Sequence, residues 1–461
     1  MNRIRHRNKN LISFIAIVSA TLFANHLFAQ KLEDYLKEGL SQNLSFRQQQ
    51  LLAEKSSFAS KEAGGAFLPS ISLNARATEL YGNVINLGAF INPAYAALNQ
   101  VTSSNAFPTD LDIRLPLQRE TTVQIRQPIF QPKVLFNYQI KERLRESAEA
   151  DTEAKARDLI LSIKIAYYSY AKSNQLINLY QKTLPLLEEN LRVSQSLVKN
   201  EKVTADAEYR ALAELADFRQ KKAEAERLNT SAKEYFNFLL NRELHATILI
   251  NSDESLELQE VDTAFAALDY AIQLSSKREE FTVISKGIQA SEKVESIYRS
   301  DFLPTLSLGI DYGFQGNRYD FNFNQDFATI SLVMQWNIFN GFQDQAKTEQ
   351  AVIETNRLRL KEAELKRQIE LQVRTLFEEV QLAQSLISVS DARKKASDAS
   401  FQILAKKYAQ GQASLVEYLD SQTSMTNAAI NAIITRYDAV IKDAELERAT
   451  ASFPLTLFLK K

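Results

Sequence analysis

The sequence predicts a mainly α-helical fold with a β component, in which long antiparallel coiled-coil helical hairpins are combined with two β-hairpins. Three observations support this prediction. Glycine and proline are scarce, with 11 and 9 among 461 residues, which favours long uninterrupted elements. Apolar residues follow a seven-residue repeat over two very long stretches. The chain also contains an internal duplication, because residues 31–69 align without a gap with residues 266–304.

The composition excludes several classes of function. The formal net charge is −1, so the whole chain offers no electrostatic basis for binding nucleic acid. There is no cysteine, which excludes disulfides, thiolate metal sites, cysteine nucleophiles and a lipid anchor on an N-terminal cysteine. The three histidines are His6, His26 and His245, and the first two lie in a segment predicted to be cleaved. A histidine triad within one chain is therefore excluded, and we expect no enzyme, no cofactor and no structural metal ion.

Residues 1–29 are predicted to be a cleaved signal peptide. Four basic residues between Arg3 and Lys9 precede an apolar run over residues 11–24, and Ala29 stands before a polar stretch. The apolar run is shorter than the roughly 20 residues of a transmembrane helix. We expect cleavage after Ala29 and export of the mature chain.

The first repeat spans residues 30–265. It begins with a helical stretch that ends in Phe-Leu-Pro at positions 67–69. Ile71 and Leu73 then alternate with polar residues, which is typical of a strand with one apolar face. The residues from 82 to 118 include three prolines and are predicted to form a long exposed loop. In order, we expect a β-hairpin at 71–130, long helices at 133–200 and 203–244, and a linker at 241–262 with possible short strands at 247–249 and 256–261.

The second repeat spans residues 266–461 and follows the same order. Its helical stretch again ends in Phe-Leu-Pro, at positions 302–304. Leu308 and Ile310 alternate with polar residues, as the corresponding strand of the first repeat does. We expect a β-hairpin at 306–339 and long helices at 343–410 and 414–453.

The long helices carry coiled-coil seams. Ile163 and Val373 belong to series of apolar or small residues that step by three and four positions. Roughly 65 residues rising 1.5 Å each make a rod on the order of 100 Å, so most of each rod must stand outside a bilayer. Pro185 predicts a kink or a change of packing partner. Tight turns near Asn200 and Gly411 are expected to fold each rod back on itself as an antiparallel hairpin.

The four predicted strands have the length of membrane-spanning β-strands. Each is about 10 residues long with one apolar face, although a half-buried soluble sheet has the same alternation. The export signal and the long helices favour the membrane. Aromatic residues near the strand ends are predicted to form an interfacial belt; they are Tyr81, Phe130, Phe314, Trp336 and Phe339.

Four strands cannot close a membrane barrel by themselves, since the smallest barrels need about eight. An open sheet edge is not tolerated in lipid. If the strands enter a membrane, copies of the chain must therefore pool them. Two copies would supply eight strands and three would supply twelve.

Taken in this order, these features resemble the TolC-like outer-membrane efflux proteins over essentially the whole mature chain. The strongest local match is residues 408–420, which resemble the turn at the periplasmic end of the family's second helical hairpin. The resemblance implies a homotrimer with a twelve-strand barrel in the outer membrane of a Gram-negative bacterium, continued by a twelve-helix periplasmic tunnel. It also implies the exit duct of a tripartite efflux or type I secretion system, conducting substrates passively and gated at the periplasmic helix tips.

The resemblance also assigns site residues. Glu417 and Asp420 match acidic positions at the tunnel's narrow inner end, where three copies would form stacked carboxylate rings open to block by cations. An ordinary solvated helix face is the alternative. Asp206 and Tyr408 fall on positions of a polar link in the closed state, although Tyr408 could simply pack at a helix end. Ala413 stands where relatives often carry an arginine, so the closing network is expected to be thinner or to use other residues.

The implied partners are a periplasmic adaptor (membrane fusion protein), an inner-membrane pump of the RND, ABC or MFS type, and outer-membrane lipid. Cargo specificity is implied to reside in the pump. A soluble periplasmic coiled-coil scaffold is the alternative function. The adaptor is expected to dock at the helical turns, whose polar residues are Lys199, Asn200, Glu201, Lys202, Gln410, Gly411 and Gln412.

Overall fold

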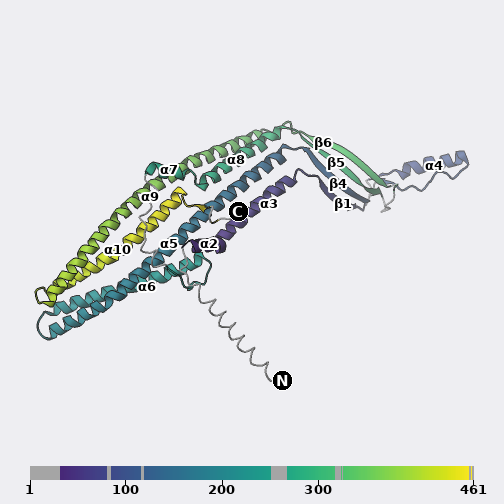
Figure 1. Cartoon of the computed structure of the whole chain (residues 1–461). Coiled ribbons are helices and arrows are strands. Elements are labelled where there is room, and N and C mark those ends of the chain that lie inside the picture. The colour runs from purple at the N-terminus through teal and green to yellow at the C-terminus, as the bar shows by residue number, and fades with distance from the viewer. Residues whose placement is uncertain are drawn as a thin grey trace, which may run out of the picture. The chain divides into compact units, whose positions relative to one another are not determined.

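The computed structural model of the chain describes residues 32–79, 85–115, 119–250, 267–316, 323, 325–455 and 458, with the backbone alone for residues 114–115 (Figure 1). The predicted signal peptide, the predicted strand at 256–261 and Tyr81 lie outside these residues. The chain forms two compact units. Of the described residues, the helical unit comprises those within Met1–Leu52, Glu149–Val283 and Glu362–Lys461, and the sheet unit comprises those within Ala53–Ala148 and Ile284–Lys361.

The predicted fold class is confirmed, because long helices paired as antiparallel hairpins are combined with two β-hairpins (Figure 1). α5 continues through Pro185 as one helix. No helix in the described part of the chain is both long enough and apolar enough to cross a membrane. The helices of the two repeats are α2 (Leu32–Gln42), α3 (Leu44–Gly65), α5 (Pro132–Lys199) and α6 (Ala205–Leu239), then α7 (Leu268–Ser275), α8 (Glu279–Arg299), the 3-10 turn η1 (Ser300–Phe302), α9 (Gln343–Ala409) and α10 (Leu415–Thr450).

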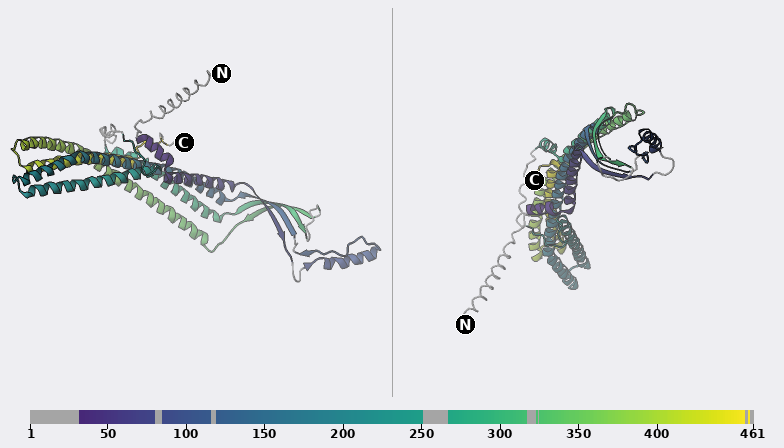
Figure 2. Two further views of the ribbon diagram at one scale, coloured as in Figure 1. Left: turned by 90° about the horizontal axis from the view of Figure 1, so that it is seen from below. Right: turned by 90° about the vertical axis from the view of Figure 1, so that its right-hand side faces the viewer.

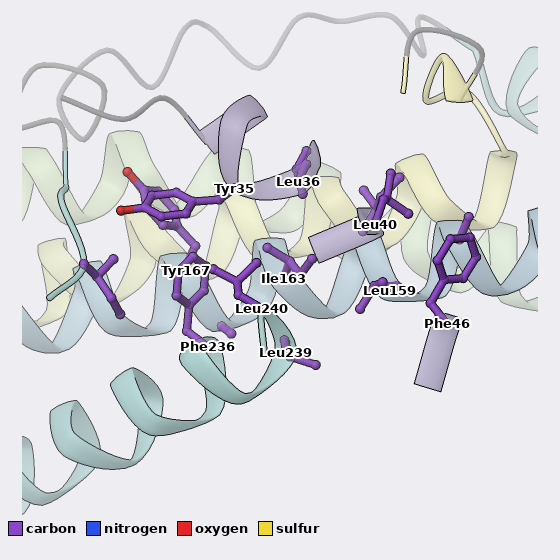
Figure 3. Close-up of a cluster of buried hydrophobic side chains, with 14 of the residues drawn as sticks. Tyr35, Leu36, Leu40, Phe46, Leu159, Ile163, Tyr167, Phe236, Leu239 and Leu240 are labelled. Carbon is purple, nitrogen blue, oxygen red and sulfur yellow. The ribbon is translucent and has the colours of Figure 1, made fainter. Parts of the chain in front are cut away.

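The main core of the helical unit lies where α2 and the start of α3 cover α5 and α6 (Figure 3). Tyr35, Ile163 and Phe236 are fully buried there. The rings of Tyr35 and Phe236 meet edge to face with centroids 5.0 Å apart, a favourable aromatic geometry. The hydroxyl of Tyr35 accepts a hydrogen bond from the backbone N–H of Leu249 at 2.9 Å, so its polar atom is satisfied.

A second core repeats this arrangement in the other half of the chain. Ala271 of α7 packs against Ile369 and Val373 of α9 and Leu446 of α10. In the internal alignment Ala271 corresponds to Leu36, and both residues are buried. The duplication therefore places a short helix over each long helical hairpin.

The sheet unit contains one four-stranded antiparallel sheet with the order β1-β4-β5-β6. Its strands are β1 (Ser70–Ala77), β4 (Arg119–Phe130), β5 (Thr305–Gly316) and β6 (Asp326–Gln335). The central pairing, β4 with β5, joins the two repeats. β1 and β6 are the outermost strands.

The register separates an apolar face of the sheet from a polar face. Directly paired residues share a face, and one row across the four strands contains isoleucine alone, at positions 71, 125, 310 and 330. Ile71 is 70% exposed and Ile330 is 77% exposed in the single chain. The next row belongs to the opposite face and contains Ser72, Gln124, Asp311 and Thr329.

The described members of the predicted aromatic belt lie near the strand ends. Phe130 is the last residue of β4, and Trp336 directly follows β6, where its indole N–H donates to the carbonyl of Phe302 at 3.1 Å. Phe314 lies near the opposite end of β5. Phe339 is 70% exposed. Their role at a membrane interface stays a prediction.

Two expectations were wrong. Residues 247–249 form no strand; the side-chain amide of Asn237 donates instead to the carbonyls of Leu244 and Ala246, each at 2.9 Å. The predicted loop at 82–118 contains helix α4 (Gly88–Thr102), which includes Pro93, and the short ladder of β2 (Ile85–Asn86) with β3 (Arg114–Leu115). Prolines favour a loop, but side-chain contacts to the returning chain stabilise this helix.

Candidate functional site at the tips of the helical hairpins

The turns of the two helical hairpins lie at the same end of the helical unit (Figure 1). One turn joins α5 to α6 and the other joins α9 to α10. All seven residues predicted to dock an adaptor are exposed there. The single chain therefore presents two neighbouring polar turns.

The two turns share one hydrogen-bond pattern. The backbone N–H of Gln412 donates to the carbonyl of Lys407 at 2.8 Å, and that of Lys202 donates to Leu197 at 2.9 Å. Both bonds bridge five residues, as in a Schellman motif. The left-handed residue is Gly411 in one turn, with φ of 70°, and Glu201 in the other, with φ of 53°. The first turn therefore holds a non-glycine residue in a conformation that glycine adopts more easily.

Glu417 has a structural role at the start of α10. Its carboxylate accepts hydrogen bonds from the backbone N–H and the hydroxyl of Ser414, both at 2.8 Å. In return, the Ser414 hydroxyl accepts from the backbone N–H of Glu417 at 3.2 Å, which completes a capping box. The hydrogen bond from the Ser414 backbone lowers the pKa of Glu417, so this carboxylate is charged at neutral pH.

Asp420 belongs to an acidic group between α6 and α10. It is exposed, and its charge acts on Glu214, a partly buried carboxyl of α6. Burial raises the pKa of Glu214, and the charges of Asp420 and Asp217 raise it further. The hydroxyl of Thr423 donates to Glu214. Sequence reasoning missed Glu214 because it lies in an ordinary polar helical stretch, and only the neighbouring helix sets it apart.

Asp206 and Tyr408 have other partners within the single chain. Asp206 accepts a hydrogen bond from Arg210, one turn along α6, at 2.8 Å. Tyr408 stacks on Tyr418 with ring centroids 4.9 Å apart, and burial raises its pKa. Ala207, next to Asp206, packs in the same apolar cluster as Tyr408. Asp206 itself is exposed, and its contact with Tyr408 in a closed assembly stays a prediction.

A buried polar pair joins the two hairpins behind the tips. The side-chain amide of Asn190 on α5 donates to the amide oxygen of Gln422 on α10. Gln422 is fully buried, and Asn190 is 8% exposed. Ser194, one turn nearer the tip, is also fully buried, and its hydroxyl donates to the Asn190 carbonyl at 2.8 Å. Such a pair specifies which residues of the two hairpins face each other.

Breaking this pair is expected to destabilise the packing of the hairpins. Asn190→Leu or Gln422→Met alone leaves one buried amide without its partner, at a cost of about 1–3 kcal/mol. The double variant removes both amides, so its loss should be smaller than the sum of the two single losses. Thermal unfolding of the purified protein in detergent measures these effects. Additive losses in the double-mutant cycle would show that the two amides do not interact.

Part of the chain matches a known protein family. Residues 259–452 match the family described as outer membrane efflux protein. The resemblance predicted from the sequence is thereby confirmed. A comparison with curated protein sequences gives no match.

Solved structures of similar proteins share this fold over most of their length. The outer membrane protein VceC from Vibrio cholerae is 16% identical, with a TM-score of 0.73 and coverage of 91% of this chain and 95% of that chain. The CmeC outer membrane channel of Campylobacter jejuni is 14% identical, with a TM-score of 0.73 and coverage of 91% and 85%. The open state of the MtrE outer membrane channel of Neisseria gonorrhoeae is 14% identical, with a TM-score of 0.73 and coverage of 91% and 89%. At these identities the shared property is the fold.

Proposed function

We propose that the protein is the outer-membrane exit duct of an efflux system, assembled as a homotrimer and extending into the periplasm. One observation carries the proposal. The four-stranded sheet exposes an apolar face and ends in two outer strands, while the same chain continues into helices of 68 and 67 residues. The family match of residues 259–452 supports the same function.

The strand order supports assembly of identical copies. β1 and β6 each have one side that no described strand of the same chain pairs, and lipid does not tolerate such an edge. The four strands alternate in direction, so β6 of one copy can pair with β1 of the next without breaking the antiparallel order. Three copies bring twelve strands together and the helical hairpins with them.

The proposed mechanism is passive conduction with a gate at the helix tips. In the trimer, three copies of Glu417 and Asp420 bring negative charge to the inner end of the duct. The lowered pKa of Glu417 keeps that residue charged at neutral pH, and the field of such a ring concentrates cations. Opening requires the tips to separate, and the contact between Asp206 and Tyr408 would belong to the closed state.

The proposed partners dock at the exposed turns. A periplasmic adaptor would contact the turn residues from Lys199 to Lys202 and from Gln410 to Gln412, all of which are exposed. An inner-membrane pump of the RND, ABC or MFS type, or a type I secretion pump, would supply the cargo. A soluble periplasmic scaffold fits less well, because it would leave the apolar sheet face in water.

Cell fractionation tests the proposal. We expect the mature protein in the outer-membrane fraction, soluble only in detergent, and chemical cross-linking of lysines should yield a trimer. Release by osmotic shock as a monomer would instead support the soluble scaffold. Two cross-linked copies without a third would refute the trimer while leaving the membrane location intact.

A further inference from the structure

Helix α4 belongs to a defined structure between β1 and β4. The ladder of β2 with β3 closes its base. Gly88 is the first residue of α4 and has no room for a side chain, because a Cβ atom there would lie 1.8 Å from the carbonyl oxygen of Leu111. A tightly packed turn therefore starts the helix.

Two asparagines fasten α4 to the returning chain. Asn92 accepts from the backbone N–H of Leu111 at 2.9 Å and donates to its carbonyl at 3.0 Å. Asn99 makes the same pair of bonds with Phe107, at 3.0 and 2.7 Å. The two asparagines are seven residues apart, so they lie on one side of the helix. That side of α4 therefore contacts the returning segment of the same chain.

The opposite side of α4 is apolar and exposed. Phe90 is 76% exposed, Leu98 is 43% exposed and Val101 is 83% exposed. Ala94 and Ala97 are exposed as well, and these five residues share one helix face, called the α4 face below. No aspartate, glutamate, lysine or arginine occurs between residues 80 and 109. The face is therefore apolar within a completely uncharged segment.

Within the sheet unit, α4 lies beyond the strand ends and on the concave side of the curved sheet. The left view of Figure 2 shows the first property, and the end-on view at the right shows the second. When copies of the sheet close into a ring, the concave side is the inside. Each copy then brings one α4 face to the outer end of the same lumen.

We propose that the α4 faces of the assembled copies pack against one another and form an apolar constriction over the outer mouth of the duct. The proposal rests on the proposed function, because it needs copies arranged around one axis. Symmetry brings identical side chains together at such an axis, where charged residues would repel each other. An uncharged, apolar face is compatible with this self-contact. The α4 face is therefore covered by the α4 face of another copy of the chain.

The membrane surface is a less suitable occupant. Helices that lie on membranes usually combine an apolar face with lysine or arginine on the polar face. In α4 the polar face holds Asn92 and Asn99, which bind the chain itself. The concave side of the sheet also faces away from lipid in a closed ring.

Disulfide cross-linking tests the contact without background, since the natural chain has no cysteine. Val101→Cys places the only thiol on the α4 face, and Gln100→Cys places it roughly 100° around the same helix as a matched control. Oxidation of isolated outer membranes should convert up to about two-thirds of the Val101→Cys chains into dimers, because one disulfide joins two of three subunits. The Gln100→Cys protein should give several-fold less dimer.

A second measurement keeps the result independent of disulfide geometry. In the Phe90→Cys protein, a bulky maleimide should react slowly, because neighbouring copies cover the thiol. Adding Val101→Asp should speed this labelling on the order of tenfold through repulsion between copies, whereas adding Gln100→Asp should not.

The outcomes separate the inference from the proposed function. Lysine cross-linking reports the trimer independently of α4. A trimer in which Val101→Cys forms no more dimer than Gln100→Cys, and in which Val101→Asp does not speed labelling, would overturn the constriction alone. Quenching of a fluorophore at position 101 by spin-labelled lipid would also overturn it, in favour of the membrane surface. A monomer throughout would overturn both proposals.

Discussion

Replacing Ile330 with arginine is expected to abolish assembly in the outer membrane, whereas replacing its neighbour Thr329 with arginine is expected to be tolerated. Ile330 lies in the middle of β6 on the apolar face and is 77% exposed in the single chain. Arginine at the middle of a lipid-facing strand costs about 2–4 kcal/mol, a factor of about 30 to 1000 for each chain. Three copies would each carry that cost.

Thr329 is the matched control for this experiment. Thr329 lies on the opposite face of the sheet, where it pairs with Asp311. Its hydroxyl donates a hydrogen bond to the Asp311 carboxylate at 3.3 Å. An arginine there would stand beside a carboxylate on the polar face. The amount of trimer in the outer-membrane fraction measures both variants. Equal loss in the two variants, or greater loss in Thr329→Arg, would contradict the assignment of the faces.

Neutralising Asp420 is expected to weaken block of the channel by divalent cations. Three copies of this exposed carboxylate would surround one constriction, and in a water-like medium each unit charge about 8 Å from a divalent cation contributes about 1 kcal/mol. Removing three charges with Asp420→Asn should therefore raise the blocking concentration on the order of a hundredfold. Single-channel recording with added divalent cations measures it.

Glu417 needs a different substitution because it also caps α10. Glu417→Gln removes the charge but can keep the capping box, whereas Glu417→Ala would also destabilise the first turn of the helix. We expect Glu417→Gln combined with Asp420→Asn to weaken the block more than Asp420→Asn alone. Glu378→Gln, at an exposed position of α9 far from the turns, serves as the control. An unchanged block in the combined variant would remove both residues from the gate.

Local periodicity in the sequence was sufficient to predict the long helices and the four strands of the main sheet. Ile163 and Val373, which belong to the predicted seams, are both fully buried. The alternation in β5 and β6 predicted one apolar and one polar face, and the register shows rows of each kind. These patterns are readable because a helix or a strand presents the same side at a short fixed interval along the chain.

The candidate site was predicted in part. The resemblance drew attention to Glu417, and the structure shows its capping role, which the spacing from Ser414 already contains. Glu214 could not be predicted, because its altered pKa depends on burial and on charges that include one on another helix. The same holds for Asn190 and Gln422, which are 232 residues apart in the chain and meet through the packing of two hairpins.

Helix α4 shows the difference between what local sequence patterns predict and what only tertiary contacts decide. The three prolines of residues 82–118 predict a loop, but Asn92 and Asn99 bind the returning backbone and leave a helix with one exposed side. Repeating patterns of apolar residues were enough for the long hairpins and the strands, since each depends on neighbours a few positions away. Only the tertiary structure decided helix α4, the acidic group around Glu214 and the Asn190–Gln422 pair. Each of them depends on contacts between segments that are distant in the sequence and that folding brings together.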